Sequence, residues 1–340
     1  MLQPSPPRKR HGRLARSGAA SMVLLAVAGY LVVQYVTGGA GAPGCKVTSV
    51  GGGSARTTYE FTPEQAVNAA TITAVGTARK LPEQAVTIAL ATALQESALR
   101  NLDHGDKDSL GLFQQRPSWG WGTPEEIMDP AYSAGAFYDH LVKVPGYLDL
   151  PVTDAAQRVQ RSGFPDAYAK HEPDAELLAA ALTGRSAATL TCDGRPGATR
   201  EKGPDAIRAA LVRDFGHTVL QPAGTDVDAD GNGNASTGTA AGSGSGSGSD
   251  ERTVTVPVTG GTGAGAEREA GRRGWQLAHW AVANASALHI QRVSYAGREW
   301  TAGNTDSKWY PTTATEDKGA DEGGKGAERT AGSVRITSAR

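Results

Sequence analysis

The sequence predicts a mainly α-helical protein, in which an N-terminal transmembrane helix, a helical domain, a glycine- and serine-rich linker and a small α+β module follow one another. Three observations support this prediction. Apolar residues recur at helical spacing across residues 58–216, after helix-start signals. The run 19–37 contains no Lys, Arg, Asp or Glu. Residues 242–249 are a strict Gly-Ser repeat, which cannot bury enough apolar surface to fold.

The composition indicates that apolar residues are clustered along the chain, and the net charge argues against a nucleic-acid partner. Of the 340 residues, 39% are hydrophobic, 6% are aromatic and 44 residues are glycine, so the apolar side chains must gather in patches. The formal net charge of −1 gives no global field that would attract nucleic acid. We therefore expect no nucleic-acid partner, and the basic cluster within residues 1–18 needs another explanation.

The basic tail 1–18 precedes the apolar run 19–37, which is close to the ~20 residues that cross a bilayer as a helix. A basic flank on one side predicts a cytoplasmic N-terminus and an exported remainder. We expect residues 19–37 to anchor the chain in the cytoplasmic membrane and residues 38–57, rich in Gly, Ser and Thr, to be a flexible tether. The alternative is a signal peptide cleaved after Ala42, which would give a secreted form. Both readings place the rest of the chain outside the cytoplasm.

Cys45 and Cys192 are the only two cysteines. In an oxidising compartment an even pair is more often a disulfide than a metal or redox site, so we expect them to be bonded. Closing a loop of this size contributes on the order of 4 kcal/mol in the chain-entropy model. Two unpaired thiols are the alternative.

Helix-start signals open the domain predicted at 58–216. Thr62-Pro63-Glu64 and Leu81-Pro82-Glu83 each place a proline in the first turn, ahead of an apolar pattern. The second of these helices is apolar on more than one face, so we expect it to be buried. No strand pattern competes in this region. Further helices are expected at 124–128, 132–142, 153–160, 167–182 and 204–215, the last closed by Gly216.

Residues 217–273 are expected to be a disordered linker, because Gly, Ala, Ser and Thr dominate them. Order is expected to return in a small α+β module at 274–340, which begins with a helix from Trp275 to Ala285. A core of about 65 residues is marginal. Strands are expected at 293–295, 299–301 and 334–336, with a disordered insert at 314–330.

The residues that carry chemistry follow the buried helix. Glu96 stands near its end, and Ser97 and a loop from Asp103 to Gln115 come next. A carboxyl group that emerges from an apolar helix into a loop-lined cleft is desolvated, which raises its pKa and keeps it protonated near neutral pH. Protonation of a glycosidic oxygen requires such a general acid. The alternative is a charged side chain that points into water.

This window resembles the lytic transglycosylases and other goose-type members of the lysozyme-like superfamily. Their pattern is a Glu-Ser pair that closes a helix, followed by Gly-Leu-Met-Gln. Gly111 and Gln114 stand 15 and 18 positions after Glu96, as in the family, with Phe113 in place of the Met. The resemblance covers about residues 60–185 and implies a lysozyme-like helical domain with Glu96 as its catalytic acid.

The resemblance also suggests which residues hold the substrate. Ser109, Gln114 and backbone amides near Gly111 would hold acetamido groups, and two tryptophans would stack on sugar faces unless they are packing anchors. Two features depart from the family: Asp108-Ser109 replaces its Gly-Ala, and Tyr168 lies where its Tyr-Asn-Ala-Gly segment has no clear copy. The candidate substrate-binding residues are Ser109, Gly111, Leu112, Phe113, Gln114, Gln115, Trp119, Trp121, Tyr138 and Tyr168.

Two mechanisms stay open at this point. In a hydrolase, Asp103, Asp106 or Asp108 would hold a water or stabilise the oxocarbenium-like state, although loop aspartates are ordinarily solvated turn residues. In a transglycosylase, as the resemblance implies, Glu96 acts first as an acid and then as a base on the sugar 6-hydroxyl. No cofactor and no metal are expected, since the run of alternating aspartates from Asp226 lacks the closing Glu of an EF-hand.

We therefore expect a membrane-tethered muramidase or lytic transglycosylase-like enzyme that acts on peptidoglycan glycan strands outside the cytoplasm. The module at 274–340 resembles a small domain appended to other actinobacterial wall proteins, and its aromatic residues either bind wall polymer or form its core. The alternative function is a non-catalytic wall-binding or envelope-assembly protein on the same scaffold. A membrane transporter fits poorly, because one apolar span cannot line a pathway.

Overall fold

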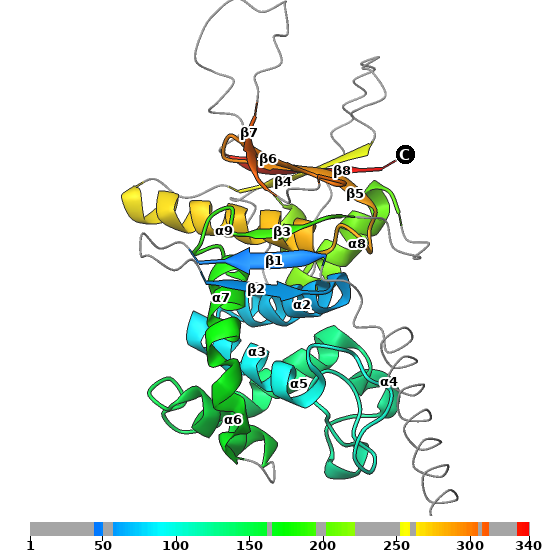
Figure 1. Ribbon diagram of the computed structural model, residues 1–340, viewed down its shortest axis with the longest axis vertical. Helices are drawn as coiled ribbons and strands as arrows, with labels where there is room; N and C mark the ends of the chain where they lie inside the picture. Colours follow the sequence, from blue (N-terminus) through cyan, green and yellow to red (C-terminus); the bar gives the residue numbers. More distant parts are fainter. Residues whose placement is uncertain are drawn as a thin grey trace, which may run out of the picture. The chain divides into compact units, whose positions relative to one another are not determined.

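The computed structural model describes residues 44–49, 57–161, 165–194, 202–221, 252–258, 263–304, 308–312 and 332–339. Helices are combined with a three-stranded and a five-stranded antiparallel sheet (Figure 1). The prediction of a mainly α-helical protein is therefore wrong. Several strands have only two to four residues, too few to show an alternating pattern, and β1 and β3 pair with each other across more than 140 residues of sequence.

The three-stranded sheet has the order β2-β1-β3 and joins both ends of the helical region. It consists of β1 (Cys45–Thr48), β2 (Thr58–Phe61) and β3 (Leu190–Cys192). Cys45 lies opposite Cys192 in the β1–β3 pair, and a disulfide joins the two residues across a sequence separation of 147. The predicted disulfide is confirmed, whereas β1 lies within the segment that we expected to be a tether.

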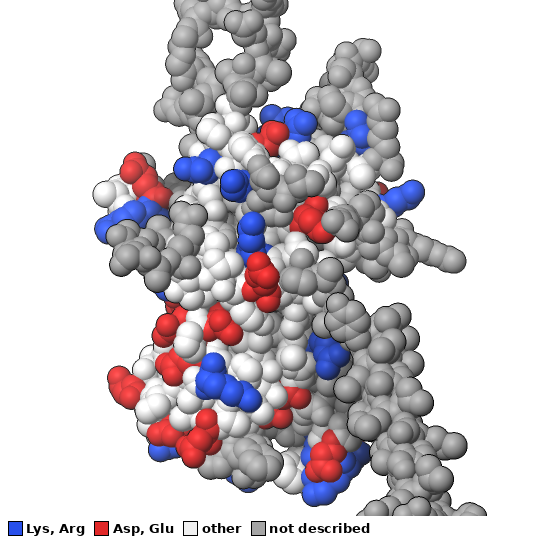
Figure 2. All heavy atoms as spheres, viewed as in Figure 1, with Lys and Arg blue, Asp and Glu red and all other residues white. Residues whose placement is uncertain are grey.

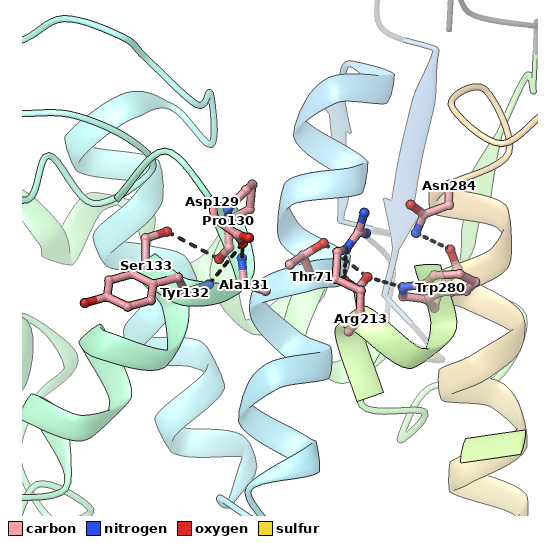
Figure 3. Close-up of polar contacts among 10 residues, drawn as sticks. Thr71, Asp129, Pro130, Ala131, Tyr132, Ser133, Arg213, Trp280 and Asn284 are labelled. Atoms are coloured by element: carbon pink, nitrogen blue, oxygen red, sulfur yellow. Dashed lines mark hydrogen bonds and ion pairs between the residues drawn. The ribbon is translucent and has the colours of Figure 1, made fainter. Parts of the chain in front are cut away.

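The helices occur where the apolar spacing predicts them. Thr62 caps the first of them in a reciprocal capping box with Gln65, as the start signal indicates. Asp129 caps α5, because its carboxylate accepts hydrogen bonds from the backbone N–H groups of Ala131 and Tyr132 (Figure 3). The helices of this region are α2 (Pro63–Ala78), α3 (Glu83–Ser97), α4 (Pro124–Ile127), α5 (Pro130–Leu141), α6 (Val152–Gln160), α7 (Glu172–Leu182) and α8 (Pro204–Phe215), with 3₁₀ helices at Pro117–Trp119, Pro165–His171 and His217–Leu220.

Helix α3 lies at the centre of this region and positions the candidate site. Every residue from Ala85 to Leu94 is buried, as expected for a helix that is apolar on several faces. The helix packs against α2, α5, α6 and α7. Burial on all sides fixes the axis of α3, and therefore fixes the side chains at its C-terminal end.

The five-stranded sheet has the order β4-β8-β5-β6-β7. The strands predicted at 293–295, 299–301 and 334–336 are confirmed as parts of β5, β6 and β8. Strand β4 lies within the segment that we expected to be a linker, and it buries Val254 and Val256 against the core. The bounds are β4 (Thr253–Pro257), β5 (Ile290–Tyr295), β6 (Arg298–Thr301), β7 (Tyr310–Pro311) and β8 (Ser333–Ser338).

Helix α9 (Ala264–Ala283) packs against β5 and β8 of this sheet and also against α2, α7 and β3 (Figure 1). A buried carboxylate strengthens this junction: Asp214 of α8 accepts hydrogen bonds from Trp280 of α9 at 2.7 Å and from Thr71 of α2 at 3.2 Å (Figure 3). The described elements from β1 to β8 form one compact unit and share a core.

In the part of the chain that the structure describes, no helix combines the length and the apolar character needed to cross a membrane. The segment 19–37, for which we expected a transmembrane helix, lies outside the described residues. The same holds for the insert expected at 314–330 and for the Gly-Ser repeat.

Candidate active site

Glu96 is held at the end of α3 by an unusual backbone turn. The next two residues after Ser97, Ala98 and Leu99, both adopt the left-handed conformation, with φ of 52° and 58°. This conformation costs non-glycine residues free energy, so surrounding contacts must stabilise it. Asn68 and Gln65 of α2 supply them, because their side-chain amides donate to the carbonyls of Leu99 at 2.8 Å and Ala98 at 2.9 Å. The helix therefore stops directly after the Glu-Ser pair.

Ser97 joins this helix end to the loop that carries the second half of the motif. Its hydroxyl is buried and donates to the carbonyl oxygens of Leu112 at 2.8 Å and Ala93 at 3.1 Å. The serine hydroxyl therefore joins the last turn of α3 to the loop at Leu112. The Glu-Ser pair and the Gly-Leu-Phe-Gln element, which are 15 residues apart at Ser97 and Leu112, thus form one structural unit.

The loop is folded back on itself by short bridges between Leu102 and Gly111 and between Leu110 and Gln115. Gly111 has φ of +75°, and a Cβ there would lie 2.7 Å from the carbonyl oxygen of Ile127. Only glycine satisfies both conditions. The Gln115 amide donates to the carbonyl of Ser133 at 3.0 Å, which attaches the loop to α5.

The Glu96 carboxyl is partly buried and has specific hydrogen-bond partners. The Tyr168 hydroxyl donates to Glu96 Oε1 at 2.7 Å. Burial raises the pKa of Glu96 above its ordinary value, while hydrogen bonds from the side chains of Tyr168 and Gln160 oppose this rise. The result is a carboxyl that stays protonated to higher pH than an exposed glutamate. It also has donors in place to stabilise the carboxylate that forms when its proton leaves.

A cavity of about 690 Å³ has Gln160, one of these hydrogen-bond partners, in its wall. Gln160 connects the two, because it hydrogen-bonds Glu96, donates to the Phe113 carbonyl at 2.7 Å and lines the cavity. Glu96 itself is not one of the lining residues. The lining residues are Trp119, Trp121, His140, Lys143, Val144, Pro145, Arg158, Val159, Gln160 and Arg161.

The two tryptophans of this cavity differ in exposure, since Trp121 packs against the core and Trp119 does not. Trp119 is 59% exposed, and the Arg116 guanidinium lies 4.5 Å from the centroid of its ring. Trp121 stacks on His140 with ring centroids 4.2 Å apart. A large apolar side chain that remains exposed at the edge of a cavity marks a binding surface better than a packing anchor. Both residues were predicted to contact sugar.

Two of the three loop aspartates, Asp103 and Asp108, form hydrogen bonds or ion pairs with side chains of the same loop. Asp108 accepts hydrogen bonds from the backbone N–H of Ser118 at 2.9 Å and from Arg116 Nε at 2.6 Å, and hydrogen bonds from the side chain and backbone of Ser118 and from Arg116 hold its pKa far below the ordinary value. Asp103 is exposed and pairs with His104 at 2.7 Å. Asp108 therefore stabilises the loop that carries Trp119, rather than standing free to hold a water.

The other predicted substrate-binding residues lie at different depths. Ser109, Leu112, Phe113, Gln115 and Tyr138 are buried. Phe113 stacks on Phe137 with ring centroids 4.7 Å apart, and the Tyr138 hydroxyl donates to the Ile72 carbonyl at 3.0 Å. Gln114 is partly buried, has φ of 48°, and donates to the Gly111 carbonyl at 3.3 Å. The structure brings Tyr168 to Glu96 and brings the tryptophans to the cavity, whereas the buried loop side chains lie in the core and Tyr138 joins α5 to α2.

The sequence analysis missed Gln160 and His171. Gln160 ends α6, and His171 Nε2 lies 3.2 Å from Gln95 Oε1, next to the candidate acid. Burial lowers the pKa of His171, which favours its neutral form. Neither residue belongs to a recognisable motif, and the packing of α6 and of the 3₁₀ helix Pro165–His171 on α3 alone brings them near Glu96.

Replacing Tyr168 with Phe is expected to raise the pKa of Glu96 further, because the lost hydroxyl stabilises the ionised carboxylate. The measurement is an NMR titration of the Glu96 side-chain carboxyl carbon in wild type and variant. Tyr310→Phe, which removes an exposed hydroxyl on β7, is the matched control and should leave that pKa unchanged. An unchanged or lower Glu96 pKa in Tyr168→Phe would contradict the assigned hydrogen bond.

The described residues contain no group of three or more His, Cys, Asp or Glu side chains that could hold a metal ion. No protein-family model matches this chain, and a search of curated proteins finds no match.

Proposed function

We propose that this protein is a glycosidase that cleaves the glycan strands of peptidoglycan, with Glu96 as its general acid. The observation that carries the proposal is the environment of the Glu96 carboxyl. It is desolvated at the end of a buried helix, bonded to Tyr168 at 2.7 Å, and joined through Gln160 to a cavity with two tryptophans at its edge. A general acid needs a proton that it retains near neutral pH and a site for the leaving group.

The motif geometry supports membership of the lysozyme-like superfamily as part of this proposal. In the resemblance, the Glu-Ser pair and the Gly-Leu-Phe-Gln element act together, and here the Ser97–Leu112 hydrogen bond joins them. Gly111 has a steric reason to be glycine, and Tyr168 is in contact with Glu96. These contacts are what such a site would require, although the spacing alone did not imply any of them.

The arrangement favours the transglycosylase route over hydrolysis. Glu96 protonates the glycosidic oxygen as the bond from that oxygen to C1 breaks, and Tyr168 and Gln160 stabilise the resulting carboxylate. The carboxylate then accepts the proton of the sugar 6-hydroxyl, whose oxygen bonds C1 to give a 1,6-anhydro end. No second carboxylate is required, which agrees with the engagement of Asp108 by Arg116 and Ser118.

The proposed site of action is outside the cytoplasm. The Cys45–Cys192 disulfide supports it, because structural disulfides persist in oxidising compartments and are rare in the cytosol. Peptidoglycan occupies the same compartment. The exported protein and its proposed substrate would therefore lie in the same compartment.

Digestion of purified peptidoglycan, followed by mass spectrometry of the released muropeptides, tests the proposal. We expect soluble fragments with 1,6-anhydro ends. Fragments with reducing ends would show that the protein is a glycosidase that hydrolyses the bond, and the proposed transglycosylase route would be wrong. If wild type releases no fragments while it still co-sediments with the polymer, the protein is a wall-binding protein and the enzymatic proposal is wrong.

A further inference from the structure

A second cavity, of about 920 Å³, lies at the opposite end of α3 from Glu96. It is bounded by the end of α2, the start of α3, Thr183 after α7, Phe215 of α8 and the first half of α9. Helix α3 begins at Glu83, and with a rise of 1.5 Å per residue about 20 Å of helix separates Glu83 from Glu96. The cavity is therefore distinct from the candidate active site.

The charge of this cavity is predominantly positive. Its acidic residues are Glu83 and Glu269, and Glu83 already has partners. Arg185 Nε donates to both of its oxygens, at 2.7 and 3.0 Å, and Thr183 donates to one of them at 3.1 Å. Little of the Glu83 charge remains to neutralise the wall of the cavity. The basic lining residues are Lys80, Arg268, Arg272 and Arg273.

Arg273 is the most informative of these cations, because its side chain is partly buried and its contacts are with neutral groups. Its guanidinium lies 4.6 Å from the centroid of the Phe215 ring and donates to Gln276 Oε1 at 2.7 Å. Gln276 in turn donates to the Thr77 hydroxyl, which fixes the orientation of its amide. Burial lowers the pKa of Arg273 to about 10. Within the described ranges, no carboxylate forms an ion pair with Arg273.

A partly buried cation that has only neutral partners is desolvated without an opposite charge to offset that cost, which disfavours the folded state. An anion that enters the cavity would supply this charge. Arg268 and Arg272 line the same cavity; Arg268 Nε donates to the carbonyl of Ala264 at 3.1 Å, and Arg272 lies 3.7 Å from Glu83. Figure 2 shows Lys and Arg side chains together with acidic ones at the end of α9 that projects to the left.

We propose that this cavity binds a phosphate group carried by a small organic molecule. The planar guanidinium groups of Arg268, Arg272 and Arg273 can each donate two parallel hydrogen bonds to phosphate oxygens. The volume exceeds what inorganic phosphate needs and lies in the range of small-molecule sites. Leu81, Pro82 and Phe215 give the cavity an apolar wall for the organic part of the ligand.

The test uses the full chain and inorganic diphosphate as a soluble probe, with binding measured by isothermal titration calorimetry at about 0.15 M salt, where non-specific surface attraction is screened. We expect saturable binding that weakens at least tenfold in the double variant Arg268→Gln/Arg272→Gln. Both side chains are exposed on one face of α9, so the variant should fold. The control is the double variant Arg208→Gln/Arg298→Gln, whose substitutions lie in α8 and β6. It changes the net charge of the protein by the same amount and should bind diphosphate like wild type.

Vesicles distinguish a phospholipid headgroup from a soluble phosphorylated molecule. Binding to phosphatidylglycerol vesicles but not to phosphatidylcholine vesicles, lost in the Arg268→Gln/Arg272→Gln variant, would identify the lipid source. Binding to diphosphate alone would identify the soluble source. The proposal is wrong if neither probe binds saturably, or if both double variants weaken binding equally, because the effect would then be one of net charge.

Discussion

Replacing Glu96 with Gln is expected to lower the rate of peptidoglycan cleavage about 10²- to 10⁴-fold, which is the range that general acid–base catalysis contributes. Gln has nearly the same shape and can still accept the Tyr168 hydrogen bond, but it has no proton of suitable acidity to donate. The measurement is the time course of soluble muropeptide release, with products quantified by mass spectrometry. The pH should be the one at which wild type is fastest.

The stability of this variant provides the folding control. The folded-state pKa of Glu96 is raised, so the carboxyl favours the folded state below its unfolded pKa, and this contribution is lost as the pH rises through the folded pKa. Gln cannot ionise, and Glu96→Gln is therefore expected to be no less stable than wild type at neutral pH, as thermal denaturation would show.

Glu64→Gln is the matched activity control, because it makes the same chemical change at an exposed position in the first turn of α2. It should cleave at the wild-type rate. If Glu96→Gln also cleaves at the wild-type rate, Glu96 is not the general acid, and the glycosidase mechanism proposed for this site fails.

Removing the Cys45–Cys192 disulfide is expected to lower the free energy of unfolding by about 4 to 5 kcal/mol. The bond closes a loop with a sequence separation of 147 residues, and in the chain-entropy model the cross-link acts mainly by restricting the unfolded state. Cys45→Ala/Cys192→Ala is the variant to use, since both positions are buried and alanine leaves no polar atom there. Urea denaturation followed by circular dichroism measures the change.

A reducing agent gives the control for this experiment. It should destabilise wild type toward the level of the double variant and leave the double variant unchanged. A loss below about 1 kcal/mol would show that the β1–β3 pairing already orders both ends of the helical region without the covalent link.

The residues of the candidate active site and those of the arginine-lined cavity differ in how far the sequence alone identifies them. Glu96, Ser97 and Gly111 stand out in the sequence because their spacing and residue types are specific, and the structure gives each a physical role. Gln160 and Arg273 do not stand out. Their importance depends on their tertiary contacts. The residue type at one position of an amphipathic helix does not indicate which distant residues it will contact.

The helices and the disulfide were predictable because their signals are local or compositional. A capping residue, a proline at the helix start and an apolar period of 3.6 residues act within one segment: Thr62 caps α2 with Pro63 in its first turn, and Pro82 directly precedes α3. The strands β1, β3 and β4 were not predictable, because each is short and gains its hydrogen bonds from a partner about 80 to 150 residues away.

Local patterning thus determined where the chain is helical and which glutamate stands at the end of the buried helix. The packing of distant segments decided everything that depends on proximity: the two sheets, the contact of Tyr168 and Gln160 with Glu96, and the cavity lined by Arg273. The physical reason is that backbone dihedrals and caps depend on neighbours within about four residues, whereas desolvation and charge pairing depend on every atom within several ångströms, whatever its position in the chain.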